Sequence, residues 1–230
     1  PSYTQATTGD IKTYEPVNFA YVYIPNDWKT AKLFGIKGTE AAEELAITLQ
    51  TDGWFTGLVS YNYDSFYLTN GGTGDSLKTS VSVSPKQDIG VNPYYMVVAD
   101  EKDTSGLYKT SIQYTKPTID VKTYVMHAIV PASWTEPHLW AWNNASGTGP
   151  FTTWPGEKLT KNGDYFDYEV PTFCDSIIIN DGGVQNGVKG DTVIQTVDLK
   201  DVEAKECWIT VGDINAEGKY ASSVVYTKPA

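Results

Sequence analysis

The stretch "YVMHAIVPASW", Tyr124 to Trp134, decides the fold, because it alternates like a β-strand and then ends at a proline followed by a tryptophan. The same pattern occurs earlier in the chain as "FAYVYIPNDW", Phe19 to Trp28. A strand that recurs together with its ending indicates that two segments of the chain fold alike.

Two more pairs of matching segments follow these strands. "DSFYLTNGG", Asp64 to Gly72, aligns with "DSIIINDGG", Asp175 to Gly183, and "SIQYTKP" at Pro117 aligns with "SVVYTKP" at Pro229. Because all three matches keep the same order, the sequence predicts an internal tandem repeat with a short linker near Lys116 to Lys122. The predicted division is an N-terminal segment at 1–14, a first module at 15–118 and a second module at 119–230.

The apolar runs predict an all-β protein. They are rich in Val, Ile, Thr and Tyr, and turn signals such as "TDG", "TNGG" and "NDGG" divide them into short segments. This pattern is typical of two tandem antiparallel β-sandwich modules of the immunoglobulin-like kind. One exception is "GTEAAEELAITL", Gly38 to Leu49, in which "TEAAEEL" could form a helical turn capped by Thr39.

The charge pattern limits the classes of partner. The net charge is −11, and all 17 basic residues are lysines. Binding to nucleic acid needs a basic patch and usually arginine, so no nucleic-acid partner is expected. No apolar run approaches the roughly 20 residues that a membrane helix needs, so no membrane insertion is expected. The start at Pro1, without a signal-peptide pattern, suggests a piece of a longer protein.

The two cysteines, Cys174 and Cys207, both lie in the second repeat, and their aligned positions in the first are Tyr63 and roughly Tyr95. Residues that change together are expected to be neighbours in space. The sequence leaves two alternatives open, a disulfide and a pair of small buried thiols. Their spacing matches no metal-binding pair, and neither a metal nor another cofactor is expected.

Three of the seven tryptophans lie in "LWAWNNASGTGPFTTWPG", Leu139 to Gly156. On a strand, Trp140 and Trp142 share one face, about 6.6 to 6.8 Å apart along the chain. If Leu139 and Ala141 face the core, both indoles face solvent, and their apolar surface is unfavourable unless a partner covers it. The apolar face of a sugar ring would fit, with Trp154 reaching the same surface from the loop. The alternative is that these rings pack in the core or at a protein interface.

With these residues, the second repeat resembles the starch-binding modules of carbohydrate-binding module family 26, which are related to family 25. The resemblance rests on "YVMHAIVPASW", "LWAW", "WPGEKL" and "SIIINDGGVQ", which together cover most of Tyr124 to Gln185. It implies a β-sandwich that binds α-glucans such as starch and malto-oligosaccharides. Carried over by position, its aromatic platform would be Trp140, Trp142 and Trp154, with Trp where Tyr is common in that family.

Polar side chains near these motifs are candidates for bonds to glucose hydroxyls. They are Lys158, Gln185, and Asn180 or Asp181, although Gln185, Asn180 and Asp181 could equally serve only to build the turn, and Lys158 could be a solvated surface lysine. His127 lies in phase with Val125 and Ile129 on its strand, so a structural histidine in the core or at the sheet edge is favoured over a ligand contact. Trp134 recurs as Trp28, which favours packing over binding.

The first repeat lacks the tryptophan motif. Phe34 and Ile36 stand where Trp140 and Trp142 stand, and "WPG" has no counterpart. Its other aromatic candidates are Trp54, expected in the core, and a tyrosine cluster of Tyr61, Tyr63 and Tyr67. Glucan binding by the first repeat is therefore expected to be weak, relocated or absent.

Rival functions have weaker support in the sequence. The chain has two histidines and no nucleophile elbow or phosphate loop, so an enzyme is not expected. "DINAEG" and "DEKDTSG" resemble incomplete calcium loops and are better explained as hairpin turns. The main alternative is a structural or adhesion spacer. The favoured interpretation is an extracellular or cell-surface protein that holds starch near other starch-degrading proteins.

Overall fold

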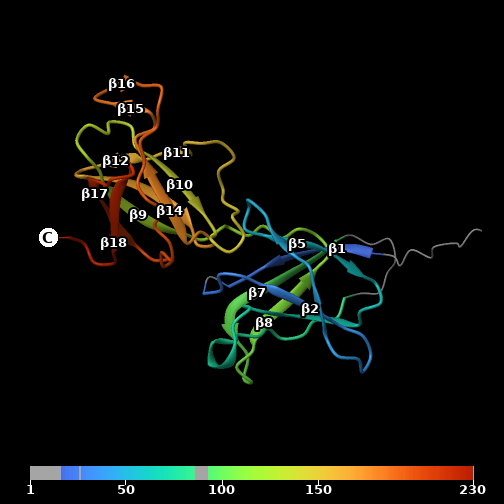
Figure 1. Cartoon of the computed structure of the whole chain (residues 1–230). Helices are drawn as coiled ribbons and strands as arrows, with labels where there is room; N and C mark the ends of the chain where they lie inside the picture. Colours follow the sequence, from blue (N-terminus) through green and yellow to red (C-terminus); the bar gives the residue numbers. More distant parts are fainter. Residues whose placement is uncertain (1–16, 26, 86–92, 230) are drawn as a thin grey trace, which may run out of the picture.

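The computed structural model describes residues 17–25, 27–85 and 93–229, and these form two groups of β-strands (Figure 1). The N-terminal segment predicted at 1–14 lies outside the described residues. Within the described residues no helix is long and apolar enough to cross a membrane. The all-β class is confirmed.

The first group contains a five-stranded sheet of order β4-β5-β1-β7-β8 and a three-stranded sheet of order β3-β2-β6. The strands of the first sheet are β4 (Thr48–Leu49), β5 (Phe55–Ser60), β1 (Val17–Tyr23), β7 (Tyr94–Lys102) and β8 (Tyr108–Gln113). Those of the second are β3 (Glu43–Leu45), β2 (Lys32–Ile36) and β6 (Ser65–Thr69). A short 3₁₀ turn, η1 (Gly74–Ser76), follows β6.

The second group follows the same plan, with a five-stranded sheet β12-β13-β9-β17-β18 and a three-stranded sheet β11-β10-β14. The first sheet consists of β12 (Thr160–Asn162), β13 (Tyr165–Pro171), β9 (Thr123–Ile129), β17 (Cys207–Ile214) and β18 (Tyr220–Val225). The second consists of β11 (Glu157–Lys158), β10 (His138–Trp142) and β14 (Ser176–Asn180). A small hairpin of β15 (Val184–Gln185) and β16 (Val188–Lys189) follows β14.

Strand pairing also corresponds between the two groups. Most described pairs are antiparallel, but β1 pairs with β7 in parallel, and β9 pairs with β17 in parallel. Across these parallel pairs, Tyr21 stacks on Tyr95 at 5.0 Å and His127 stacks on Trp208 at 4.9 Å. Such correspondence is what a tandem repeat would give. The module boundaries at 118 and 119 stay a prediction.

The recurring tryptophans are core residues, as the sequence analysis favoured. Trp28 is 2% exposed and Trp134 is 1% exposed. Each backbone N–H donates to the carbonyl of the proline three residues earlier, at 3.1 Å for Trp28 and 2.9 Å for Trp134. Each indole meets a tyrosine edge-on, Tyr108 at 5.3 Å and Tyr220 at 5.2 Å. The proline therefore ends the strand and the tight turn directs the indole into the core.

Contacts between the two groups centre on Asn143, which is 1% exposed at the end of β10. Its amide nitrogen donates to the carbonyl of Lys29 and to that of Phe173, both at 2.9 Å. The Thr148 hydroxyl donates to the Leu49 carbonyl at 3.3 Å. Because a buried amide with two bonded carbonyls is costly to displace, these contacts stabilise the junction.

The predicted helical turn in Gly38–Leu49 is wrong, because Glu43–Leu45 forms β3. Leu45 pairs with Leu33 across the sheet and packs against the core cluster of the first group. The carboxylate of Glu43 accepts a bond from the Tyr63 hydroxyl at 2.6 Å. Pairing and apolar burial therefore override the helical propensity of the Ala and Glu residues.

Cys174 and Cys207 are both free thiols in the structure, which fits the alternative of two small buried thiols. Both side chains are 0% exposed and belong to one core cluster. Burial raises the pKa of each thiol to about 12. The parallel pairing also refines the alignment, because Cys207 opposes Met126 as Tyr94 opposes Ala20.

We expect the folded protein to react very slowly with a thiol reagent at pH 8, because both sulfurs are buried and protonated. In guanidinium chloride, two thiols per chain should react rapidly. The measurement is a colorimetric thiol count with and without denaturant. Detection of no thiols in the unfolded, unreduced chain would contradict this structure and favour the disulfide.

Candidate functional site

Strand β10 alternates between the core and the surface. Leu139 and Ala141 are both 0% exposed, whereas Trp140 and Trp142 are partly exposed on the opposite face. Both indoles therefore lie on the outer face of the β11-β10-β14 sheet, as the alternation of the sequence predicts. Neither lies in the described core cluster of this group.

The loop after β10 brings more aromatic rings to Trp140. Trp154 is 43% exposed, and its ring centroid lies 5.8 Å from that of Trp140, with the ring planes at 56°. Phe151 lies 5.9 Å from Trp140 on the same loop and also meets Tyr168 at 5.9 Å. Phe151 was not predicted at the site, because nothing in "FTTW" distinguishes it from a core residue. The three rings form one angled apolar surface.

Close packing against β10 holds the loop in place. A side chain at Gly149 or at Gly156 would clash with the backbone carbonyl of Ala141 or of Leu139. Gly156 also has a φ of 90°, which glycine adopts at little cost. The Pro155 carbonyl accepts a bond from the Asn180 amide at 3.0 Å. The "WPG" motif therefore positions Trp154 through the backbone around it.

Polar side chains border the same sheet face. His138 lies in phase with Trp140 on β10 and pairs with Lys158 of β11. The Lys158 ammonium lies 3.0 Å from a Glu136 carboxylate oxygen, and the His138 Nδ1 lies 2.8 Å from the Glu136 backbone carbonyl. The alternation rule that selected Trp140 would also have selected His138, which was not proposed as a site residue.

Asn180 is corrected from a candidate sugar contact to a structural residue. It is 0% exposed, its amide donates to Pro155, and its carbonyl oxygen accepts the Gly182 N–H at 2.9 Å. Asp181 is 1% exposed and accepts the N–H groups of Gly183 and Ile194. Both residues build the turn, which is the alternative that the sequence left open for them.

Gln185 remains a candidate. It is partly buried on β15, and its amide nitrogen donates to an Asp181 carboxylate oxygen at 3.1 Å. This bond uses one of the two amide hydrogens. Gln185 lies beyond the end of β14 that pairs with His138, whereas Trp142 pairs with Ser176 at the other end.

His127 has the structural role that was favoured for it. Its Nδ1 lies 2.7 Å from an Asp167 oxygen, and its Nε2 lies 3.2 Å from a Glu206 oxygen. Burial alone would lower the pKa of His127, but the bonds to both carboxylates outweigh burial and raise it. The ring stacks on Trp208, on the sheet that does not contain β10.

Trp54 and the two calcium-like loops are structural. Trp54 is 4% exposed and packs against Tyr23 and Tyr95, as expected for a core residue. In the two calcium-like loops, Asp103 and Asn215 each accept backbone N–H groups of their own hairpin turn. Among the described residues, no cluster of three or more His, Cys, Asp or Glu side chains could hold a metal ion.

Residues 127–190 match the family model described as starch-binding module 26. These residues include Trp140, Trp142 and Trp154, and they make up less than half of the chain. No curated protein matches the sequence.

Solved structures similar to this chain include two carbohydrate-binding proteins. CBMbc of family CBM26 from Eubacterium rectale Amy13K, in complex with maltoheptaose, is 21% identical with a TM-score of 0.31, over 91% of this chain and 98% of that chain. Family 41 carbohydrate-binding modules from streptococcal virulence factors, described as recognising α-glucan, are 8% identical with a TM-score of 0.28. That match covers 89% of this chain and 96% of the streptococcal chain.

We expect Gly156→Ala to destabilise the protein more than Gly147→Ala. Both positions have positive φ, but a side chain at Gly147 would meet no atom of the described residues within 4 Å, whereas one at Gly156 would clash with the Leu139 carbonyl. Backbone strain should cost Gly147→Ala about 1–2 kcal/mol, and the clash should add about 1–3 kcal/mol at Gly156. Urea unfolding of both variants measures the difference. Equal losses would contradict the described loop packing.

Proposed function

We propose that the chain binds α-glucans, such as starch and malto-oligosaccharides, without catalysis, on the face of β10 that carries Trp140 and Trp142. The observation that carries this proposal is the pair of outward indoles with the 43% exposed Trp154 beside them. The match of residues 127–190 to starch-binding module 26 supports the same ligand class.

The chemistry of the face suits a neutral sugar. The C–H bonds of a glucose ring form an apolar face that packs on an indole, and this packing removes apolar surface of both partners from water. The planes of Trp140 and Trp154 differ by 56°, so successive rings of a bound chain would have to turn relative to one another. An α-1,4-linked glucan, which coils, fits such an angled surface better than a flat chain does.

Hydroxyl groups of the sugar also need partners at the border of the face. Lys158 is the first candidate, because its side chain is 53% exposed and lies on the same strand pair as Trp140. His138 and Gln185 are further candidates, since each has polar groups beyond its described bond. Asn180 acts indirectly by holding Pro155.

The proposed role is to keep the polysaccharide close to amylolytic enzymes or to the cell surface, outside the cell. A shallow surface leaves much of the sugar in water, so the expected affinity for maltoheptaose is on the order of 10 µM to 1 mM. Such weak single-site binding is sufficient where several sites contact one polymer.

We expect Trp140→Ala to weaken maltoheptaose binding by about 30-fold or more, because it removes a large aromatic surface at the centre of the face. Trp154→Ala should also weaken binding, and Lys158→Ala should weaken it by less. Ile214→Ala is the control, because Ile214 is 57% exposed on β17 and lies on another sheet. Calorimetric titration gives the affinities, and circular dichroism checks that each variant is folded.

Unchanged affinity in folded Trp140→Ala and Trp154→Ala variants would refute this site. No binding of the wild-type protein to any α-glucan would refute the function and would favour a structural spacer with a protein partner. Release of reducing ends from maltoheptaose would refute the claim that the chain is non-catalytic.

A further inference from the structure

The first group of strands carries an aromatic pair at the place that corresponds to the tryptophan face. In the register of the β3-β2-β6 sheet, Phe34 pairs with Tyr67, and in the second group Trp140 pairs with Ile178. Both β2 and β10 are the middle strand of a three-stranded sheet. Phe34 therefore takes the position of Trp140, and a second ring enters from β6 at the position of Ile178.

The two rings of this pair form one stiff unit. Their centroids lie 4.9 Å apart and their planes differ by only 8°. Both side chains are partly exposed, while Leu33 on the other face of β2 is 0% exposed. Cross-strand aromatic pairs restrict each other's rotamers, so little conformational entropy would be lost when a ligand packs against them.

A hollow of about 460 Å³ lies against this aromatic pair. Its other walls include Lys32, Thr73, Leu77 and Thr79. Leu77 is 47% exposed, so an apolar group and hydroxyl groups share the same wall. The volume is in the range of small-ligand sites, and the mixture of aromatic, aliphatic and hydroxyl surface matches a sugar ring with its hydroxyls.

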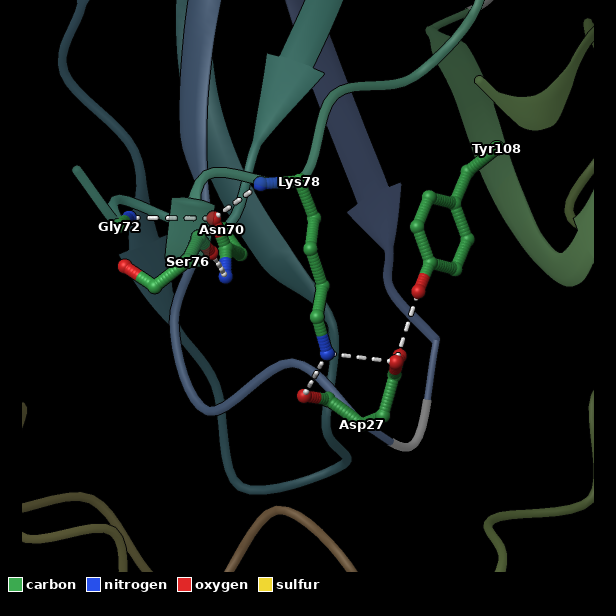
Figure 2. Close-up of polar contacts among 6 residues, drawn as sticks. All are labelled: Asp27, Asn70, Gly72, Ser76, Lys78 and Tyr108. Carbon is green, nitrogen blue, oxygen red and sulfur yellow. Dashed lines mark hydrogen bonds and ion pairs between the residues drawn. The ribbon is translucent and has the colours of Figure 1, made fainter. Parts of the chain in front are cut away.

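The loop that forms the far wall is fixed by Asn70 (Figure 2). The Asn70 side-chain oxygen accepts the N–H groups of Gly72 at 3.1 Å and Lys78 at 2.9 Å, and its amide donates to the Ser76 carbonyl at 3.0 Å. Asp181 accepts two backbone N–H groups in the corresponding turn of the second group. These hydrogen bonds therefore hold the loop in a fixed conformation without a ligand.

A second set of bonds ties this loop to the rest of the first group. The Lys78 ammonium lies 2.6 Å from an Asp27 carboxylate oxygen, which also accepts the Tyr108 hydroxyl at 2.7 Å (Figure 2). Burial alone would raise the pKa of Asp27, but the bonds from Lys78 and Tyr108 outweigh it and hold the pKa below its usual value. The Asp27 carboxylate is therefore ionised at neutral pH, where it keeps its bonds to Lys78 and Tyr108.

We propose that this hollow, between the Phe34–Tyr67 pair and the Leu77 loop, is a second α-glucan site. A glucose ring packs on the aromatic pair, and Lys32 and the threonine hydroxyls bond its hydroxyl groups. The inference rests on the proposed function, because it assigns the ligand class of the tryptophan face to this corresponding place. The sequence left weak, relocated and absent binding open for the first repeat, and this proposal corresponds to weak binding.

Two sites on one chain would act together on a polymer. The Asn143 and Thr148 bonds restrain the two groups of strands relative to each other. When one site holds starch, the other therefore meets the same chain at a high local concentration. The protein would bind insoluble starch more tightly than it binds a short oligosaccharide.

The test is a set of full-length variants titrated with maltoheptaose. Trp140→Ala/Trp142→Ala removes the tryptophan face, and Leu77→Gln or Phe34→Ala/Tyr67→Ala in that background removes the hollow. Leu107→Gln is the matched control, because Leu107 is an exposed leucine of the same strand group outside the hollow. We expect the tryptophan variant to retain weak binding, Leu77→Gln to reduce this residual binding about fivefold, and Leu107→Gln to leave it unchanged.

The outcomes separate the two proposals. Complete loss of binding in the folded tryptophan variant would overturn the second site and leave the proposed function standing. Undiminished wild-type binding in that variant, lost on Phe34→Ala/Tyr67→Ala, would support the hollow and refute the tryptophan face. Absence of binding in the wild-type protein would overturn both. Equal residual affinity for cellohexaose would overturn the assignment to α-glucans.

Discussion

The candidate site depends on the two-residue period of strand β10. Leu139 and Ala141 are completely buried, and the strand geometry then obliges Trp140 and Trp142 to face outward. The exposed apolar surface would be unfavourable in water without a partner. Gly149 and Gly156 let the backbone of the following loop lie directly against β10. The loop therefore places Trp154 beside Trp140 and does not cover the indoles. Burial of Leu139 and Ala141 on one face of β10 thus places the aromatic surface of Trp140 and Trp142 on the other face.

The same frame carries different aromatic arrangements in the two groups of strands. Trp140 contacts Phe151 and Trp154 of the following loop. Phe34 instead stacks on Tyr67 of the neighbouring strand. The turn after β14 and the turn after β6 are each fixed by one Asx side chain that accepts two backbone N–H groups. The frame is therefore maintained by buried apolar residues and turn bonds, while the outer positions of the middle strand are free to vary.

The sequence was informative where local pattern determines structure. Alternation predicted the strands and the outward indoles, and recurrence identified Trp28 and Trp134 as core residues. Prediction from the sequence failed where contacts between residues distant in the chain determine the structure. The helix-forming residues near Glu43 form a strand because Leu45 packs in the core. Asn180 looked like a surface turn residue, but the Pro155 loop buries it. Tyr67 was only one of several candidate tyrosines, because its pairing with Phe34 is set by register between strands far apart in sequence.

The most direct test of the central claim is an NMR titration that follows the indole N–H signals of the seven tryptophans with maltoheptaose. Trp140, Trp142 and Trp154 should shift in a concentration-dependent way. The buried Trp28, Trp54, Trp134 and Trp208 should shift little. Absence of any shift at the first three, with the protein folded and the sugar at millimolar concentration, would contradict the account of β10 as a glucan-binding face.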